Sequence, residues 1–350
     1  MLQHLGKIRD QSAESRRSSW PAYAGIALGA LILLVLAYWT GVQAILAPLL
    51  GGGPALLLLS LLAPLELGPR ALAWRWVHPA PDKFGWRHFI TAMWLGQSVN
   101  RLVPTASIGG DIVRARYLHA RGGDTNDSVA SLIADKAAQA AGAVGLLLLG
   151  WVLVAVSFSP GRHLLSLLFA ALGLALGVAF FIQLQRSSRV SGLLSKWSAA
   201  DDQGPLAKAR LSAERIETRL QTLYASPRYF MGSVALRVLA HSLMAVEIWL
   251  AAWLMGHPVG LYEALLLRVV AFGARNLLFI VWGGLGVQES AYALLAPWIG
   301  LSPGTLIAIS LATRIREVVI ALPGALVWLT GEGLRASRAK QRELAGPTDK

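Results

Sequence analysis

The sequence predicts an all-α polytopic membrane protein with about six spanning helices and two re-entrant helical hairpins, arranged as an inverted repeat. Of the 350 residues, 55% are hydrophobic and 15% are charged, whereas a soluble domain carries about 25% charged residues. The apolar residues form runs long enough to cross roughly 30 Å of hydrocarbon. A polar signature also occurs twice, an arginine followed eight positions later by a Gly-Gly pair: Arg101 with Gly109 and Gly110, and Arg275 with Gly283 and Gly284.

The chain begins with a polar segment, residues 1–21, followed by the uncharged run Tyr23–Gly41. This run is longer than the roughly 7–15 residues of a signal-peptide core, so we interpret it as a retained first span. Residues 22–330 are expected to form a single transmembrane domain, and residues 331–350 a cytoplasmic tail.

Six full spans fit the apolar runs, at about 22–41, 54–76, 127–156, 163–184, 229–256 and 304–330. The number of lysines and arginines alternates between high and low from one connection to the next. Residues 1–19 and 70–87 hold four each, 186–228 hold eight and 331–350 hold five. Residues 42–53, 257–262 and 290–303 hold none, and 157–162 hold one. The positive-inside rule therefore places both termini in the cytoplasm.

Two further apolar stretches do not fit as simple spans. Residues 88–108 leave the cytoplasmic side, but the basic segment 111–121 is cytoplasmic again. Residues 263–300 leave the outer side and return to it. Because three predicted spans separate these hairpins, they enter from opposite faces, which is the pattern of transporters with inverted repeats around a central substrate site.

The loop 185–228 contains an apolar stripe at helical spacing, formed by Ala209, Ala213, Ile216, Leu220 and Leu223. Basic residues lie off this stripe, which is typical of a helix on the anionic lipids of the inner leaflet. A helix packed on the other loops is the alternative. Five tryptophans near predicted span ends are expected to form an aromatic belt: Trp20, Trp39, Trp74, Trp76 and Trp328.

The composition argues against several other classes of protein. The net charge of +13 is explained by basic loops on one side of a membrane, so no nucleic acid is expected as a partner. No cysteine is present, and no two of the seven histidines lie three or four residues apart. We therefore expect no metal and no cofactor.

The helix breaks at the two Gly-Gly pairs suit an anionic head group. Half-helix N-termini offer free N–H groups and a partial positive charge, and glycine lets a ligand approach the backbone closely. Close helix packing is the alternative explanation, since small residues provide it in membranes generally.

Ionisable residues in the spans are costly, so they are expected to face the protein interior and pair there. They form either a polar pathway for a lipid head group or ion pairs that fix helix packing. Glu66 and Glu247 are weaker candidates. The predicted substrate-binding residues are Arg101, Gly109, Gly110, Asp111, Arg114, Asp135, Lys136, Arg275, Asn276, Gly283, Gly284, Gln288, Glu289, Arg314, Arg316 and Glu317.

We expect Arg101 and Arg275 to approach one central cavity, Arg101 paired with Asp111 and Arg275 with Glu289. An acidic partner lowers the cost of a membrane-buried guanidinium, which cannot lose its charge.

Three motifs carry a family resemblance: "NRLVPTASIGGDIVRARYL", "SLIADKAAQ" and "GGLGVQESAY". They resemble the membrane region of the lysylphosphatidylglycerol synthase/flippase family over about residues 22–330. The ending from "GGLGVQES" to "ALPGALVW" is similar to the hopanoid-biosynthesis-associated branch, which is implicated in moving hopanoids toward the outer membrane. Residues 280–282, Ile-Val-Trp, stand where the family often has proline, so the second hairpin tip is expected to differ.

The resemblance implies a flippase-like domain in the bacterial cytoplasmic membrane that moves a hopanoid or phospholipid without aminoacylating it, since residues up to Lys350 leave no room for an aminoacyl-transfer domain. An integral-membrane transferase acting on lipid head groups is one alternative, with Asp111 and Glu289 as acid–base groups. A non-catalytic scaffold for lipid-synthesis enzymes is another. Whether chains associate into a homo-oligomer is left open.

Overall fold

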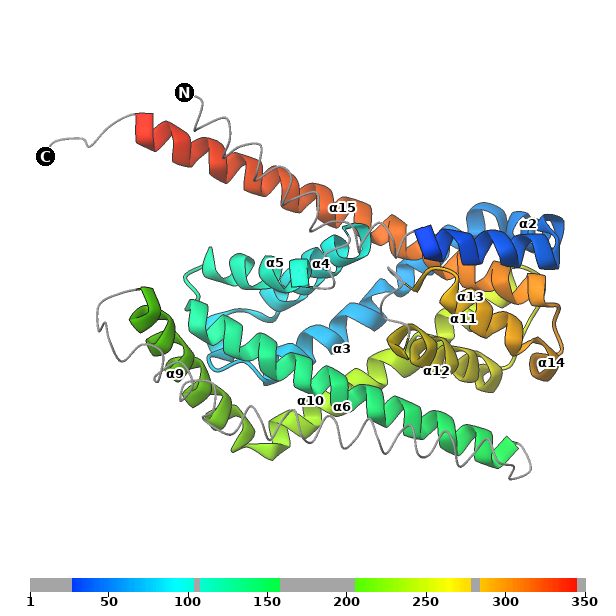
Figure 1. Ribbon diagram of the computed structural model, residues 1–350, viewed down its shortest axis with the longest axis horizontal. Helices are drawn as coiled ribbons and strands as arrows, with labels where there is room; N and C mark the ends of the chain where they lie inside the picture. The colour runs from blue at the N-terminus through cyan, green and yellow to red at the C-terminus, as the bar shows by residue number, and fades with distance from the viewer. Residues whose placement is uncertain (1–26, 104–107, 158–204, 278–283, 345–350) are drawn as a thin grey trace, which may run out of the picture. The chain divides into compact units, whose positions relative to one another are not determined.

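The computed structural model describes residues 27–103, 108–157, 205–277 and 284–344 (Figure 1). These ranges form helices and no strand. After a first helix, Ala27–Thr40, come α2 (Val42–Gly52), η1 (Gly53–Leu62), α3 (Ala63–Trp76), η2 (Pro81–Lys83), α4 (Trp86–Leu102), α5 (Ile108–His119), α6 (Thr125–Ser157), α9 (Pro205–Tyr224), α10 (Pro227–Leu243), α11 (Ala245–Leu254), α12 (Leu261–Leu277), α13 (Val287–Leu294), α14 (Ala296–Ile299) and α15 (Pro303–Leu344).

Three helices in the described ranges are long and apolar enough to cross a membrane: Val42–Trp76, Thr125–Gly150 and Pro227–Leu254. They coincide with three of the predicted spans. Ala27–Thr40 is a shorter apolar helix at the first predicted span. The predicted span 163–184 lies outside the described residues.

The helices extend past two of the predicted span boundaries. The expected outer connection 42–53 is mostly helical, because α2 continues the apolar composition of its neighbours, and Gly53 (φ 49°) changes the chain direction before η1. The last predicted span ends at residue 330, but α15 continues to Leu344. No proline or glycine follows Leu334 within α15, and its last residues are strong helix formers.

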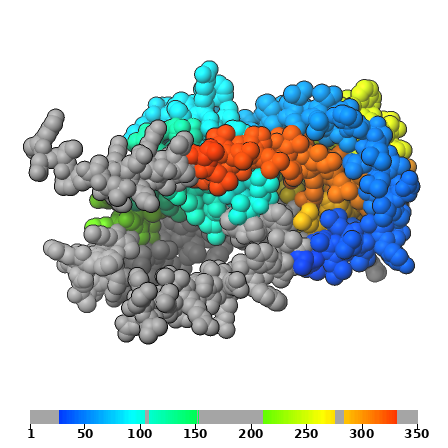
Figure 2. All heavy atoms as spheres, turned by 90° about the horizontal axis from the view of Figure 1, so that it is seen from above, coloured from blue at the N-terminus to red at the C-terminus, as the bar shows by residue number. Residues whose placement is uncertain are grey.

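The chain divides into two compact units, each built from separate stretches of sequence. Unit 1 comprises the helix Ala27–Thr40, α2, the start of η1, α11–α14 and α15 up to Ile315. Its core joins Leu59, Ile248, Leu267 and Ile307. Gly304 at the start of α15 contacts Ala44 of α2 closely (2.8 Å from an added Cβ), and Figure 2 shows the blue α2 region beside the orange part of α15.

Unit 2 comprises α3–α10 and α15 from Arg316. Its core is aromatic: Trp74 meets Phe89 edge-to-face at 5.0 Å between ring centroids, and Phe84 packs on Phe89 at 6.2 Å. Trp74 is fully buried, so its expected place in an aromatic belt was wrong. Its indole Nε1 donates to the hydroxyl of Ser131 on α6 (3.0 Å), which lets a buried tryptophan satisfy its N–H.

Helix α9 exists as predicted, but its apolar stripe packs on the protein rather than on lipid. Leu220 is buried, and Ile216 and Leu223 pack against the unit 2 core. Arg219 on the same helix pairs with Asp127 of α6 at 2.9 Å. The alternative interpretation of this stripe, a helix packed on its neighbours, is therefore the one that the structure supports.

In each unit, two consecutive described helices pack together where a hairpin was predicted. In unit 2, α4 and α5 are antiparallel, because the backbone N–H of Gly110 donates to Asn100 (2.7 Å) while His88 and Tyr117 meet at the other end (3.4 Å). In unit 1, α12 and α13 form the second pair, joined by a bond from Arg275 to Gln288 (3.0 Å). Gly109 and Gly110 lie in the first turn of α5, and Gly283 lies outside the described residues, so the helix breaks expected at the two pairs stay a prediction. Re-entry from opposite faces stays a prediction.

Candidate functional site

One buried carboxylate in unit 2 holds three arginines. Glu66, in the first turn of α3, is 3% exposed at its side chain and accepts from Arg70 (2.7 Å), Arg101 (2.7 Å) and Arg316 (3.0 Å). Glu317 lies 4.0 Å from Arg101. These five residues, the Glu66 cluster, come from α3, α4 and α15.

A second set of charges in unit 2, the Asp135 cluster, alternates in sign. Asp135 on α6 is 1% exposed at its side chain and pairs with Arg237 of α10 and with Arg114 of α5 (2.6 Å). Arg114 also reaches Asp111 (3.2 Å), and Asp111 pairs with Lys136 (2.9 Å). Lys136 is 39% exposed at its side chain. The connected ion pairs therefore lead from the buried Arg237 to a partly exposed lysine.

Helical periodicity explains this arrangement locally. Asp111 and Arg114 stand three residues apart on one face of α5. The guanidinium carbon of Arg114 lies over the indole of Trp74, 4.0 Å from the ring centroid. Such stacking and forked donation favour arginine over lysine at this position.

Unit 1 carries a corresponding set, the Glu289 cluster. The Glu289 side chain is 0% exposed and accepts from Arg314 Nε (2.8 Å) and from the Ser310 hydroxyl (2.8 Å). Arg314 also donates to the carbonyl of Gly284 (2.7 Å). Gln288 accepts from Arg275 (3.0 Å) and donates to Ser310 (2.9 Å).

Gly110 and Gly284, one glycine from each signature, serve close packing. A Cβ on Gly110 would meet the Gly96 carbonyl and, at 2.5 Å, the amide of Asn100. Gly284 has φ +63°, and an added Cβ would meet Arg275 at 2.6 Å. At Gly110 and Gly284, therefore, the partner arm of the hairpin occupies the space that we expected a ligand to use. Gly283 lies outside the described residues, and Asn276 lies in α12.

The predicted pairing partners differ from those observed. Arg101 is paired with Glu66 instead of Asp111, because the first turn of α3 lies beside the end of α4. Glu289 is engaged by Arg314, and Arg275 reaches the neighbouring Gln288. Arg101 and Arg275 belong to different units, so their approach to one cavity stays a prediction.

Sequence reasoning missed or undervalued several members of these clusters. Arg237 lies in the apolar run of α10 and was not singled out, although a charge within a span is itself a signal. Glu66 was ranked low, yet it carries three ion pairs. Ser310 gave no signal, because a single hydroxyl in a helix is common.

His78 lies in the connection after α3 and is buried against Trp74, Phe84 and Phe89. Burial lowers its pKa from 6.5 to about 4, although the charge of Asp127 acts in the opposite direction. Its Nδ1 accepts from the backbone N–H of Ala80 (3.1 Å). The imidazole is therefore neutral at pH 7.

Among the residues named for each cluster, bases outnumber acids by one. The Glu66 cluster has three arginines and two glutamates, the Asp135 cluster three bases and two aspartates, and the Glu289 cluster two arginines and one glutamate. A buried charge is stable only when it is compensated. The Asp135 cluster is therefore electrostatically suited to an anion.

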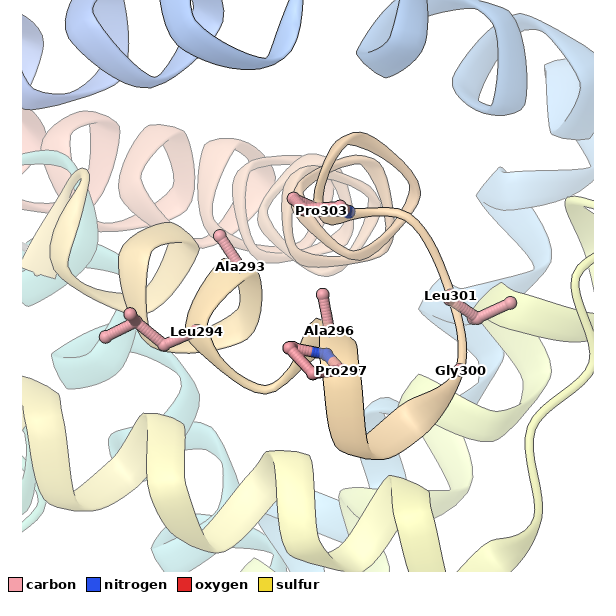
Figure 3. A pocket seen from close by; sticks show the side chains of 7 residues that line it. All are labelled: Ala293, Leu294, Ala296, Pro297, Gly300, Leu301 and Pro303. Carbon is pink, nitrogen blue, oxygen red and sulfur yellow. The ribbon is translucent and has the colours of Figure 1, made fainter.

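No group of His, Asp and Glu in the described ranges could hold a metal ion. An apolar pocket of about 490 Å³ opens in unit 1 where α13, α14 and α15 meet (Figure 3). Its lining holds none of the predicted site residues.

Comparison with known proteins gives the family. Searches of curated proteins and of solved structures found no significant match. The family model of the lysylphosphatidylglycerol synthase TM region matches residues 23–324, which is most of the chain and includes all three clusters. Its long apolar helices agree with a protein embedded in a membrane. The chain belongs to the lysylphosphatidylglycerol synthase TM region family, whose members are membrane proteins involved in lipid metabolism or transport.

Proposed function

We propose that this protein is a flippase-like transporter, which moves an amphipathic lipid across the bacterial cytoplasmic membrane without altering it chemically. The observation that carries the proposal is the set of buried charged clusters in a protein whose apolar helices are long enough to cross a membrane. Charges at membrane depth are costly and generally mark a pathway for a polar substrate. A hopanoid is the candidate suggested by the C-terminal motifs, and a phospholipid is the other.

Reconstitution into vesicles tests the proposal. Fluorescent phosphatidylglycerol, phosphatidylethanolamine and a polyol-bearing hopanoid would each be placed in one leaflet, and a membrane-impermeant quencher would report their movement. We expect one of the three to cross faster with the protein than in empty vesicles. Movement of none of them would contradict the proposal.

Variants of the two signature arginines make the test specific. Arg101→Ala and Arg275→Ala should abolish movement while the protein still inserts and folds. Lysine at either position should restore little, because it cannot reproduce a forked contact. The control is Arg215→Ala at an exposed position on α9. Full transport by well-folded alanine variants would remove both arginines from the site.

Mass spectrometry of the recovered lipid separates transport from chemistry. An unchanged lipid in the opposite leaflet supports a transporter, whereas a modified head group would support the transferase alternative.

A further inference from the structure

Four helices of unit 2 recur in unit 1 in the same order, with the same charges at the same places. Helices α3, α4, α5 and α6 correspond to α11, α12, α13 and α15. The first helix of each set has a glutamate in its first turn, the second an arginine in its last turn, and the third an acid in its first turn. These residues are Glu66 and Glu247, Arg101 and Arg275, and Asp111 and Glu289.

The correspondence extends to the fourth helix. Lys136 is the twelfth residue of α6, which begins at Thr125, and Arg314 is the twelfth of α15, which begins at Pro303. Each base pairs with the acid 25 positions before it. Lys136 Nζ lies 2.9 Å from Asp111, and Arg314 Nε lies 2.8 Å from Glu289. Matching positions and matching pairs make a chance resemblance between the two sets difficult to sustain.

We propose that Asp111–Lys136 and Glu289–Arg314 are two copies of one binding site for an anionic lipid head group. This inference rests on the proposed function and assigns its substrate a charge. In each copy the carboxylate holds the base in place, and a phosphate diester displaces the carboxylate to bind the base.

The positive net charge favours an anionic ligand over a cation or a neutral polyol. The copy in unit 2 lies in the Asp135 cluster, where three bases meet two aspartates, so one negative charge neutralises that cluster. Lysine and arginine are the common partners of phosphate oxygens in proteins. A cation would add to the excess, and a neutral polyol would leave it uncompensated.

The copies differ in accessibility. The side chains of Lys136 and Asp111 are 39% and 19% exposed, whereas those of Arg314 and Glu289 are 14% and 0% exposed. The copy in unit 2 is therefore the one open to a ligand in this conformation.

Binding of fluorescent phosphatidylglycerol to the full chain in detergent tests this proposal. Lys136→Gln should weaken binding at least tenfold, and Arg314→Gln should weaken it less. Asp111→Asn should strengthen binding severalfold, because it removes the competing carboxylate. Asp127→Asn, which breaks the Asp127–Arg219 pair on the same helix α6, is the matched control and should leave binding unchanged.

Opposite effects of Lys136→Gln and Asp111→Asn separate a binding site from a structural ion pair. Equal losses in both variants, or no change in either, would overturn the proposal. Diacylglycerol with the same chains should not compete with the probe, and inorganic phosphate should compete only weakly. Competition by a neutral polyol lipid as strong as by phosphatidylglycerol would also overturn it.

A chemical rescue guards against misfolding of the variants. The chain has no cysteine, so Lys136→Cys provides a single thiol. Attaching an aminoethyl group by a disulfide recreates a lysine-like ammonium and should restore binding, whereas a methyl group should not. Restoration by both groups would show that charge is irrelevant. Because binding needs no transport, vesicles without lipid movement would count against the proposed function alone.

Discussion

At the scale of single residues, the three clusters follow from the cost of burying charge. Asp135 has two arginines and Glu66 has three, because a carboxylate with several lone pairs can compensate several guanidinium groups. Removing one partner of a buried pair leaves an uncompensated charge, which is far costlier than breaking a pair at the surface.

Asp135→Asn should therefore destabilise the protein by about 3–5 kcal/mol, because Arg114 and Arg237 lose their shared anion. Denaturant unfolding in detergent measures this loss. Asp127→Asn, which breaks a pair whose arginine side chain is 55% exposed, should cost less than about 1 kcal/mol. Equal losses in the two variants would show that burial of the Asp135 cluster contributes nothing.

His78 gives a prediction about pH. Its folded-state pKa of about 4 lies below the ordinary 6.5, so the unfolded chain takes up the proton first. Stability is fully present above about pH 6.5 and is lost as the pH falls toward 4, by about 3 kcal/mol in all. Melting temperatures measured in detergent across this pH window should fall as the pH is lowered, which gives a slope of stability against pH.

His78→Asn should remove that slope, because its side-chain oxygen can accept from Ala80 in place of Nδ1 without titrating. His257→Asn, in the connection between α11 and α12, should retain it. A slope that persists in His78→Asn would assign the pH dependence to another group.

At the scale of elements, the hairpin α4–α5 depends on two glycines that face each other. An added Cβ on Gly96 would meet the Gly110 carbonyl at 2.6 Å, and one on Gly110 would meet the Gly96 carbonyl in turn. Small residues allow such close approach of helices in membranes. This contact places Asp111 and Arg114 opposite α6.

Gly110→Ala should consequently separate the arms and destabilise the protein by about 1–3 kcal/mol, the usual cost of overpacking. The melting temperature in detergent and the binding of phosphatidylglycerol should both fall. Gly68→Ala on α3, where an added Cβ meets nothing within 4 Å, is the control. It should be neutral or slightly stabilising, since alanine is the better helix former. A Gly110→Ala variant as stable as Gly68→Ala would contradict the packing role.

At the scale of the whole molecule, the distribution of lysine and arginine predicts the topology. Residues 186–228 hold eight basic residues and 257–262 hold none, so the first segment is expected in the cytoplasm and the second outside.

Single cysteines on the cysteine-free chain can test this topology. Arg215→Cys on α9 should react with an impermeant thiol reagent only after the cells are permeabilised. Leu261→Cys, at an exposed position at the start of α12, should react in intact cells. The reverse pattern of labelling would invert the topology.

The sequence alone determined the class of the protein, a helical membrane protein. Uncharged runs such as Tyr23–Gly41 admit few structures other than membrane helices, since every backbone group in lipid must be satisfied within the chain. The helix α9 also followed from local composition and period. These properties are local, so a stretch of about 20 residues contains the information.

Only the tertiary structure decided which charges meet. Arg237 and Asp135 lie 102 positions apart, and Arg316 and Glu66 lie 250 positions apart. Helical periodicity gives the face on which a side chain stands, but the neighbour that this face meets depends on how whole helices pack. For the same reason the stripe on α9 was expected on lipid and lies on α6, and Trp74 was expected at an interface and lies in the core.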